Sequence, residues 1–452
     1  MGDAERMLLG LASIFVLGVG AQWLAWRIKL PSILLLLAFG FAAGPGTGWL
    51  NPDQMFGKLL FPIVSLSVAL ILFEGSLSLK FSELAEVGKP LRNLLSIGVA
   101  VTWLVITLAA RWILGVDVAT ALLLGAMLTV TGPTVVGPLL RHIRPSGKVS
   151  SIARWEGIVI DPIGAVLAVL VFEVFDILRA ADFGKAAIDG AFGMLATAVT
   201  GVVAGSLAAW FLIECLKRYW IPERLQSPAA LMIVAAVFVA SNLVKHEAGL
   251  VSVAVMGVFL ANQKSASIKR IFEFKENLSV LLVSSLFILL AARVEFADFS
   301  QLGWRGLAFV AAVILIARPA SVVASSIGTD LSKAERIFLS WLAPRGIVAA
   351  AVASVFALRL DETGNGGGEL VPATFLVIVG TVVVYGLTAF PLARWLGLAS
   401  AEAQGVLIAS SHPGARAIGH ALKSAGFRVV LVDTNREDVM TARLEGLEAC
   451  YA

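Results

Sequence analysis

Apolar runs of about 20 residues recur along nearly the whole chain and are separated by short polar connections. A helix of that length spans the ~30 Å hydrocarbon core of a bilayer at about 1.5 Å per residue. Charged residues make up only 15% of the chain and hydrophobic residues 58%, whereas soluble domains have about 25% charged residues. So little charge cannot cover a water-facing surface. The pattern predicts an all-α polytopic membrane protein.

Thirteen such segments are predicted, and they centre near residues 17, 38, 68, 101, 130, 164, 200, 236, 254, 284, 315, 348 and 382. The first, Met7 to about Trp26, lacks a basic leader and a small-residue cleavage site, so it is interpreted as a retained span. Alternate connections hold 18 and 9 Lys and Arg residues. The positive-inside rule places the richer set in the cytoplasm. This predicts an external N-terminus and a cytoplasmic C-terminus, which an odd number of spans allows.

The few cysteines and histidines argue against a disulfide-rich protein and against a metalloenzyme. The chain has two cysteines, Cys215 and Cys450, too few for a disulfide framework or a cysteine-rich metal site. None of the four histidines lies near a second ligand at metal-binding spacing. A membrane-embedded metalloenzyme therefore has little support, and no cofactor and no nucleic-acid partner are expected.

Ionisable residues inside apolar spans are costly and are functional candidates by default. The alternative is a misplaced span end, with the residue at the interface. That alternative applies more to Glu74 and Arg318 than to Asp161, which lies deep in the run GIVIDPIGAVLAVLVF. The candidates are Glu74, Glu156, Asp161, Arg318 and Arg345.

Two spans carry helix-breaking residues in mid-run. Gly132 and Pro133 interrupt the fifth span, and Pro344 and Gly346 interrupt the twelfth. Breaks at bilayer depth are tolerated where a cavity or neighbouring groups satisfy the freed backbone, and a matched pair marks a transporter's binding site. An offset of seven spans pairs spans 1–6 with spans 8–13 and gives inverted repeats. Simple proline kinks are the alternative.

The segment after Glu402 has a different character. It reads as a short apolar strand, a turn, an amphipathic helix and a second strand that ends at Asp433. This is the opening of a nucleotide-binding α/β fold. The predicted domains are therefore 1–398 in the membrane and 403–452 in the cytoplasm. Ala452 comes far short of a complete domain, so a cut chain and a vestigial unit both stay open.

Several of these runs occur together in one known family. The runs LFEGSLSL, TVTGPTVVGPLL, RWEGIVIDPIGAVLAVL, HEAGLVSVAVMGVFLAN, ARPASV and WLAPRGIVAAAVA resemble, in order and over residues 10–398, the NhaP and sodium/proton-exchanger branch of the monovalent cation:proton antiporters. The last segment resembles the TrkA-N regulatory domain. The resemblance implies a homodimer in the inner membrane of a bacterium, with a scaffold half and a core half that moves as an elevator.

The resemblance also implies roles for individual residues. Asp161 corresponds to the ion-binding aspartate, and Thr131 to a threonine whose oxygen helps to hold the ion. Glu74 corresponds to an acidic residue near the ion. Glu156 corresponds to a glutamate that pairs with an arginine, here Arg318. The arginine beside the twelfth-span break is Arg345.

Three positions depart from the family pattern. Gly132 stands where the family has an aspartate that offsets the facing positive helix ends. Ile160 replaces an asparagine and Gly157 replaces a serine ligand. A site with fewer oxygen ligands is expected, which leaves the choice between sodium and potassium open and favours a larger, weakly hydrated ion.

The resulting hypothesis is exchange of Na⁺ or K⁺ for H⁺ through one carboxylate. Asp161 holds a proton or a cation, and both loaded forms are neutral, so electroneutral one-for-one exchange is expected. A ligand-gated potassium efflux pathway, similar to the Kef systems, is the alternative. A regulatory nucleotide at Gly414 and Asp433 is a weaker hypothesis, because Ser410, His412 and Ala415 occupy the three glycine positions of the dinucleotide fingerprint.

Overall fold

The computed structural model describes residues 3–28, 30–145, 148–178, 183–245, 247–294, 296–346, 348–350, 352–353, 356–357, 369–399 and 405–451. Three of the basic residues counted above in the connections, Lys29, Arg179 and Arg359, lie outside these residues. So do His246, one of the four histidines, and residue 403, where the second predicted domain begins. The chain divides into two compact units, Met1–Ala399 and Ser400–Ala452.

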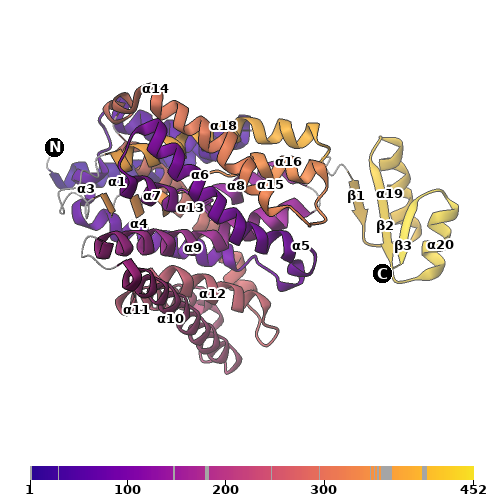
Figure 1. Cartoon of the computed structure of the whole chain (residues 1–452). Helices are drawn as coiled ribbons and strands as arrows, with labels where there is room; N and C mark the ends of the chain where they lie inside the picture. Colours follow the sequence, from indigo (N-terminus) through magenta and orange to yellow (C-terminus); the bar gives the residue numbers. More distant parts are fainter. Residues whose placement is uncertain are drawn as a thin grey trace. The chain divides into compact units, whose positions relative to one another are not determined.

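We divide the helices of the first unit (Figure 1) into two groups by their contacts, named bundle A and bundle B. One buried apolar cluster lies within bundle B, and the other joins bundle A to residues of α5, α8, α9 and α18. Bundle A contains α1 (Asp3–Ile28), α2 (Ser32–Phe41), α3 (Pro52–Phe56), α4 (Leu60–Ser76), α10 (Phe183–Lys217), α11 (Gln226–Val244), α12 (Ala248–Asn262) and α13 (Lys269–Arg293). Bundle B contains α5 (Phe81–Asn93), α6 (Val99–Ala109), α7 (Val118–Met127), α8 (Pro133–Ile143), α9 (Lys148–Leu178), α14 (Phe296–Ala312), α15 (Arg318–Ser325), α16 (Lys333–Trp341) and α18 (Leu370–Trp395). Short π and 3₁₀ turns extend or join these helices: η1 (Ala42–Gly46), η2 (Gly57–Leu59), η3 (Leu94–Gly98), η4 (Ala110–Leu114), η5 (Glu223–Leu225) and η6 (Val313–Ala317).

Nine helical segments within the described residues are long and apolar enough to cross a membrane. Three shorter apolar helices accompany them, Ser32–Gly46, Val118–Met127 and Ala248–Asn262. The unit is therefore mostly helical, as expected. The number of thirteen spans stays a prediction.

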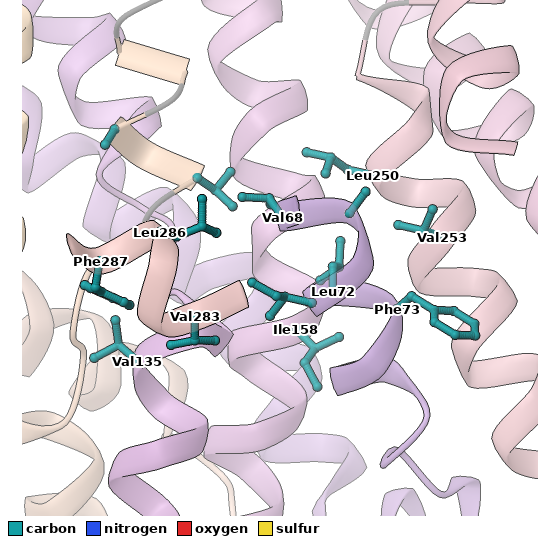
Figure 2. Close-up of a cluster of buried hydrophobic side chains, with 14 of the residues drawn as sticks. Val68, Leu72, Phe73, Val135, Ile158, Leu250, Val253, Val283, Leu286 and Phe287 are labelled. Carbon is teal, nitrogen blue, oxygen red and sulfur yellow. The ribbon is translucent and has the colours of Figure 1, made fainter. Parts of the chain in front are cut away.

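The two bundles meet along α9, which packs against α10 and α12 of bundle A as well as against bundle B. Figure 2 shows this contact: Val135 of α8 and Ile158 of α9 lie among side chains of bundle A, including Leu72 and Val283. The side chains that meet in this part of the contact are apolar.

Both predicted helix breaks lie in bundle B. Helix α7 ends at Met127 and α8 starts at Pro133, with non-helical backbone between them. Helix α16 ends at Trp341, residues 342–346 are not helical, and helical backbone resumes at residue 348. Proline suits the first helical position of α8, because its missing N–H has no partner there in any helix.

The two interrupted segments cross at a pair of glycines. The Gly132 N–H donates to the Pro344 carbonyl oxygen over 3.2 Å. A Cβ atom on Gly132 would lie 2.3 Å from the Gly346 Cα, and a Cβ on Gly346 would lie 2.5 Å from the Gly132 Cα. Each glycine therefore occupies the space that a side chain on the other would need.

The second unit is a parallel three-stranded sheet in the order β1-β2-β3. Its elements are β1 (Gly405–Ile408), α19 (Pro413–Ser424), β2 (Arg428–Asp433), α20 (Arg436–Leu444) and β3 (Glu448–Tyr451). Val406 pairs with Val429, and Val430 pairs with Glu448. A small apolar core, which includes Leu431 and Leu447, lies beneath the two helices.

The glycine crossing yields a first prediction. Gly132→Ala forces a methyl group onto the backbone of Gly346, so we expect a clear loss of thermal stability in detergent, on the order of 1–3 kcal/mol. Gly20→Ala on α1 is the matched control, because nothing lies within 4 Å of its Cβ position. Equal melting temperatures for the two variants would show that the crossing is not tightly packed.

Candidate functional site

Asp161 faces the break between α7 and α8. It shares one face of α9 with Gly157 and Gly164, since residues at i, i+4 and i+7 lie above one another on a helix. A Cβ on Gly157 would lie 3.4 Å from the Thr131 carbonyl oxygen, and one on Gly164 would lie 2.1 Å from Val130 Cγ2. The two glycines let α9 lie directly against the break, with Asp161 between the two points of contact.

Four side-chain oxygens at this place have no hydrogen-bond partner among the residues that the structure describes. Both carboxylate oxygens of Asp161 are buried, and no protein group donates a hydrogen bond to them. The hydroxyls of Thr131 and Thr134 are also buried without a partner. Other atoms in the described part of the chain share this property, but no other region brings together four such oxygens. Buried polar groups in native proteins are nearly always hydrogen-bonded, so a cluster of exceptions requires an explanation.

Arg345 lies within the crossing and is 1% exposed. Its Nη1 donates to the carbonyl oxygens of Thr129 over 3.0 Å and Val130 over 3.3 Å. The backbone N–H of Arg345 donates to Thr381 Oγ1 over 3.2 Å. The last carbonyls of a helix lack partners and carry partial negative charge. The Arg345 guanidinium supplies donors and positive charge at the buried end of α7.

Glu156 and Arg318 form a buried bidentate ion pair. Arg318 Nη1 donates to Glu156 Oε1, and Nη2 donates to Oε2 over 2.8 Å, with both side chains less than 5% exposed. Arg318 Nε donates to the Leu339 carbonyl oxygen over 2.8 Å. One guanidinium thus joins α9, α15 and α16, and the fork geometry matches a carboxylate.

A local feature of the backbone places Arg318. The π turn η6 (Val313–Ala317) directly precedes it, and Pro319 follows it. Proline has no N–H and clashes with the carbonyl four residues earlier, which widens the preceding turn. The widened turn ends where Arg318 begins α15.

A cavity of about 260 Å³ lies between the two bundles. Bundle A contributes Glu74 and Ser279 to its lining, and bundle B contributes Thr134, Arg141 and Arg154. The cavity therefore joins the N-terminal end of α8 to the basic ends of α8 and α9. Glu74 lies in the wall opposite the break.

The structure thus gathers most of the candidate residues into one region of bundle B, with Glu74 across the cavity. The sequence did not single out Thr134, although it follows the Gly132–Pro133 break directly. It also did not single out Gly164 and Thr381. Gly164 lies three residues after Asp161, and this spacing was an available signal. Thr381 has no local signal, because its contact with Arg345 spans 36 residues.

The nucleotide candidates lie in the second unit and are held by its own loop. Asp433 Oδ1 accepts from the Asn435 N–H over 3.0 Å and Oδ2 from the Ser411 N–H over 2.6 Å. These amides, Asn435 first, lower the pKa of Asp433 below its ordinary value. His412 Nδ1 accepts from the Ala415 N–H over 3.2 Å and caps α19. A Cβ on Gly414 would lie 2.9 Å from the His412 ring, so this ring occupies the helix end where a phosphate would bind, and the nucleotide stays a prediction.

Comparisons with known proteins bear on the first unit. A family model described as "Sodium/hydrogen exchanger, transmembrane" matches residues 11–395. The chain is 27% identical over 396 residues to the K(+)/H(+) antiporter NhaP of Alkalimonas amylolytica, covering 86% of this chain and 67% of that protein. It is 27% identical over 416 residues to the Na(+)/H(+) antiporter NhaH of Halobacillus aidingensis, covering 87% of this chain and 98% of that protein.

A solved structure shares the fold. The sodium proton antiporter MjNhaP1 from Methanocaldococcus jannaschii matches with a TM-score of 0.73 and 22% sequence identity, covering 86% of this chain and 99% of that chain. At this identity the match concerns the fold alone. The TrkA-N resemblance of the second unit has no counterpart in the family match, which ends at residue 395.

The buried ion pair yields a second prediction. Glu156→Gln and Arg318→Gln each strand one buried charge, and we expect losses of about 3–5 kcal/mol in detergent stability. The double variant should regain part of this loss, because no charge is left unpaired. Arg218→Gln is the control, since its pair with Glu214 is exposed and worth about 0.3–0.5 kcal/mol. Additive losses in the double variant would contradict the coupling.

Proposed function

Since the chain belongs to the sodium/hydrogen exchanger family, we propose that it exchanges a monovalent cation for a proton across a membrane at Asp161. The observation that carries this proposal is the buried carboxylate with no protein partner on either oxygen. In the described residues no Lys, Arg or His nitrogen lies within 4.0 Å of it. A bare carboxylate in such a place costs several kcal/mol or more, so it must hold either a proton or a cation.

Because Asp161 holds either a proton or a cation, the proton flux and the cation flux are coupled. Protonated Asp161 is neutral, and Asp161 with a bound monovalent cation is also neutral. Either form can pass the low-dielectric apolar layer around Ile158, whereas the bare anion passes it only at high cost. A proton therefore moves in one direction and a cation in the other.

The neighbouring charges hold the site together. Glu156 is bound at both oxygens by Arg318, and we assign this pair a structural role. Arg345 is committed to the carbonyl oxygens of Thr129 and Val130. One titrating carboxylate supports a one-for-one, electroneutral exchange.

The arrangement of the bundles supports an elevator movement. Bundle B contains Asp161 and both broken helices, and around Ile158 it meets bundle A through a layer of apolar side chains (Figure 2). Such a surface can slide without breaking strong directional bonds. The cavity beside Glu74 has Arg141 and Arg154 in its lining. By the positive-inside rule these residues support a cytoplasmic opening.

The ion is a monovalent cation, and the choice among sodium, potassium and lithium stays open. The relatives carry both Na(+)/H(+) and K(+)/H(+) in their names. Gly132 and Gly157 contribute no side-chain oxygen. A site with few oxygens favours a cation that gives up its hydration shell easily, which supports potassium.

We also propose the span number, the orientation, the oligomeric state and the membrane that the sequence predicts. Thirteen spans are obtained when α2, α12 and the two interrupted segments are added to the nine long helices. The external N-terminus, the cytoplasmic C-terminus, the homodimer, the bacterial inner membrane and a TrkA-N-like second unit follow from the sequence resemblance. No enzymatic activity is proposed.

A third prediction tests the carboxylate. Asp161→Asn should abolish cation-dependent proton flux in proteoliposomes, because an amide cannot release a proton or hold a cation by charge. Asp117→Asn is the matched control: Asp117 caps α7 through its side chain, and asparagine caps equally well. Near-normal flux in Asp161→Asn would reject the site. Bilayer conductance without proton movement in the wild type would indicate a gated efflux pathway instead.

A fourth prediction concerns membrane potential. Moving one charge across 100 mV is worth about 2.3 kcal/mol, so an electrogenic exchanger responds strongly to an imposed potential. Here the exchange rate in proteoliposomes should not change. Valinomycin can set the potential if potassium is not transported. If potassium is transported, an ionophore is needed that is selective for another ion and does not carry protons. A current on solid-supported membranes would indicate a second proton carrier, with Glu156 or Glu74 examined first.

A further inference from the structure

We propose that the Thr134 hydroxyl is an oxygen ligand of the transported cation, met as the ion passes from the cavity to Asp161. The proposal rests on the exchange function above and adds a determinant of cation affinity to it. Four observations on Thr134 support it: an unpartnered hydroxyl, its position in the helix, its place at the glycine crossing, and its place in the cavity wall.

The Thr134 side chain is 3% exposed, and its hydroxyl has no hydrogen-bond partner. Leaving a buried hydroxyl unsatisfied costs about 1–3 kcal/mol. Hydrophobic replacement would remove that cost, so the hydroxyl has a use that the protein alone does not reveal. An ion in the site would supply the missing partner.

Serine and threonine hydroxyls in the helices of this chain usually avoid this cost. They donate to the carbonyl oxygen four residues earlier, as general helix chemistry allows. Examples are Ser76 to Leu72, Ser96 to Arg92, Thr197 to Gly193, Ser284 to Val280, Thr374 to Leu370 and Thr388 to Val384. Thr134 is the second residue of α8. The residue four positions earlier, Val130, lies within the break, and its carbonyl oxygen accepts from Arg345.

Thr134 Oγ1 lies at the crossing itself. It is 3.3 Å from the Cβ position of Gly132 and 3.5 Å from that of Gly346. Pro133, the preceding residue, lies with its Cα 3.6 Å from the Cβ position of Gly157, one helical turn from Asp161. The Thr134 hydroxyl is the nearest side-chain oxygen to the Cβ positions of both Gly132 and Gly346.

Thr134 also lines the cavity between the bundles, whereas Asp161 and Thr131 do not. It is the only one of the three unpartnered residues in this region that belongs to both the cavity wall and the crossing. A cation that leaves the cavity for the carboxylate therefore meets this hydroxyl.

The chemistry of a hydroxyl suits this role. Alkali cations are hard ions that prefer oxygen ligands, and a threonine hydroxyl is a neutral oxygen that does not bind a proton near neutral pH. It strengthens cation binding without changing the charge of either loaded form. Its removal should therefore weaken cation binding and leave the turnover of the loaded carrier intact.

The test compares Thr134→Val, which is nearly isosteric, with Thr134→Ser, which keeps the hydroxyl. In proteoliposomes, with Na⁺ and K⁺ assayed separately, Thr134→Val should raise the KM for the cation about tenfold, as expected for one lost oxygen contact. The maximal rate should stay within about twofold. Thr134→Ser should restore the wild-type KM. Thr374→Val is the matched control, because its buried hydroxyl is satisfied by Leu370.

A second readout does not depend on transport. Cation binding to the folded state raises the melting temperature with concentration, so Thr134→Val should need about tenfold more Na⁺ or K⁺ for the same rise. An unchanged cation dependence in Thr134→Val, or a Thr134→Ser variant as weak as Thr134→Val, would overturn the proposal. These results leave the Asp161 proposal standing if the wild type exchanges and Asp161→Asn does not. If Thr134→Val does not purify, Thr134→Ala serves with the same expectation.

Discussion

The requirement that backbone groups find partners away from water governs the centre of this protein. Two helices break inside the membrane region, and their free ends can exist only where protein satisfies them. A few hydrogen bonds at the crossing satisfy these ends. The Gly132 N–H donates to the Pro344 carbonyl oxygen, and the Arg345 side chain donates to the carbonyl oxygens of Thr129 and Val130. The arrangement leaves a small set of side-chain oxygens unused. Those oxygens are the candidate ion site.

The buried pair of Glu156 and Arg318 serves the same centre from one side. It fixes α9 relative to α15 and α16 through a bidentate contact and a bond to the Leu339 carbonyl oxygen. This fixes the face of α9 that carries Asp161. Strong polar bonds thus lie within bundle B. They would keep this bundle rigid in the elevator movement proposed above.

Local sequence features predicted the coarse architecture, whereas the details of the site depend on contacts between residues far apart in the chain. The apolar runs predicted the long helices, and Gly132, Pro133, Pro344 and Gly346 predicted the two breaks, because chain length and proline chemistry act locally. The contact between Arg345 and Thr129 joins residues 216 positions apart, and no periodicity encodes it. Thr134 was missed for the same reason: a threonine at a helix start is ordinary until the packing around it leaves its hydroxyl without a partner.

The interlocked glycines have a thermodynamic consequence. Each backbone fills the place of the other's side chain, so the two broken helices would not shift past one another in the proposed elevator movement. The ligands around the ion would then keep one geometry on both sides of the membrane. A site of constant geometry would bind its cation with the same intrinsic free energy from either side.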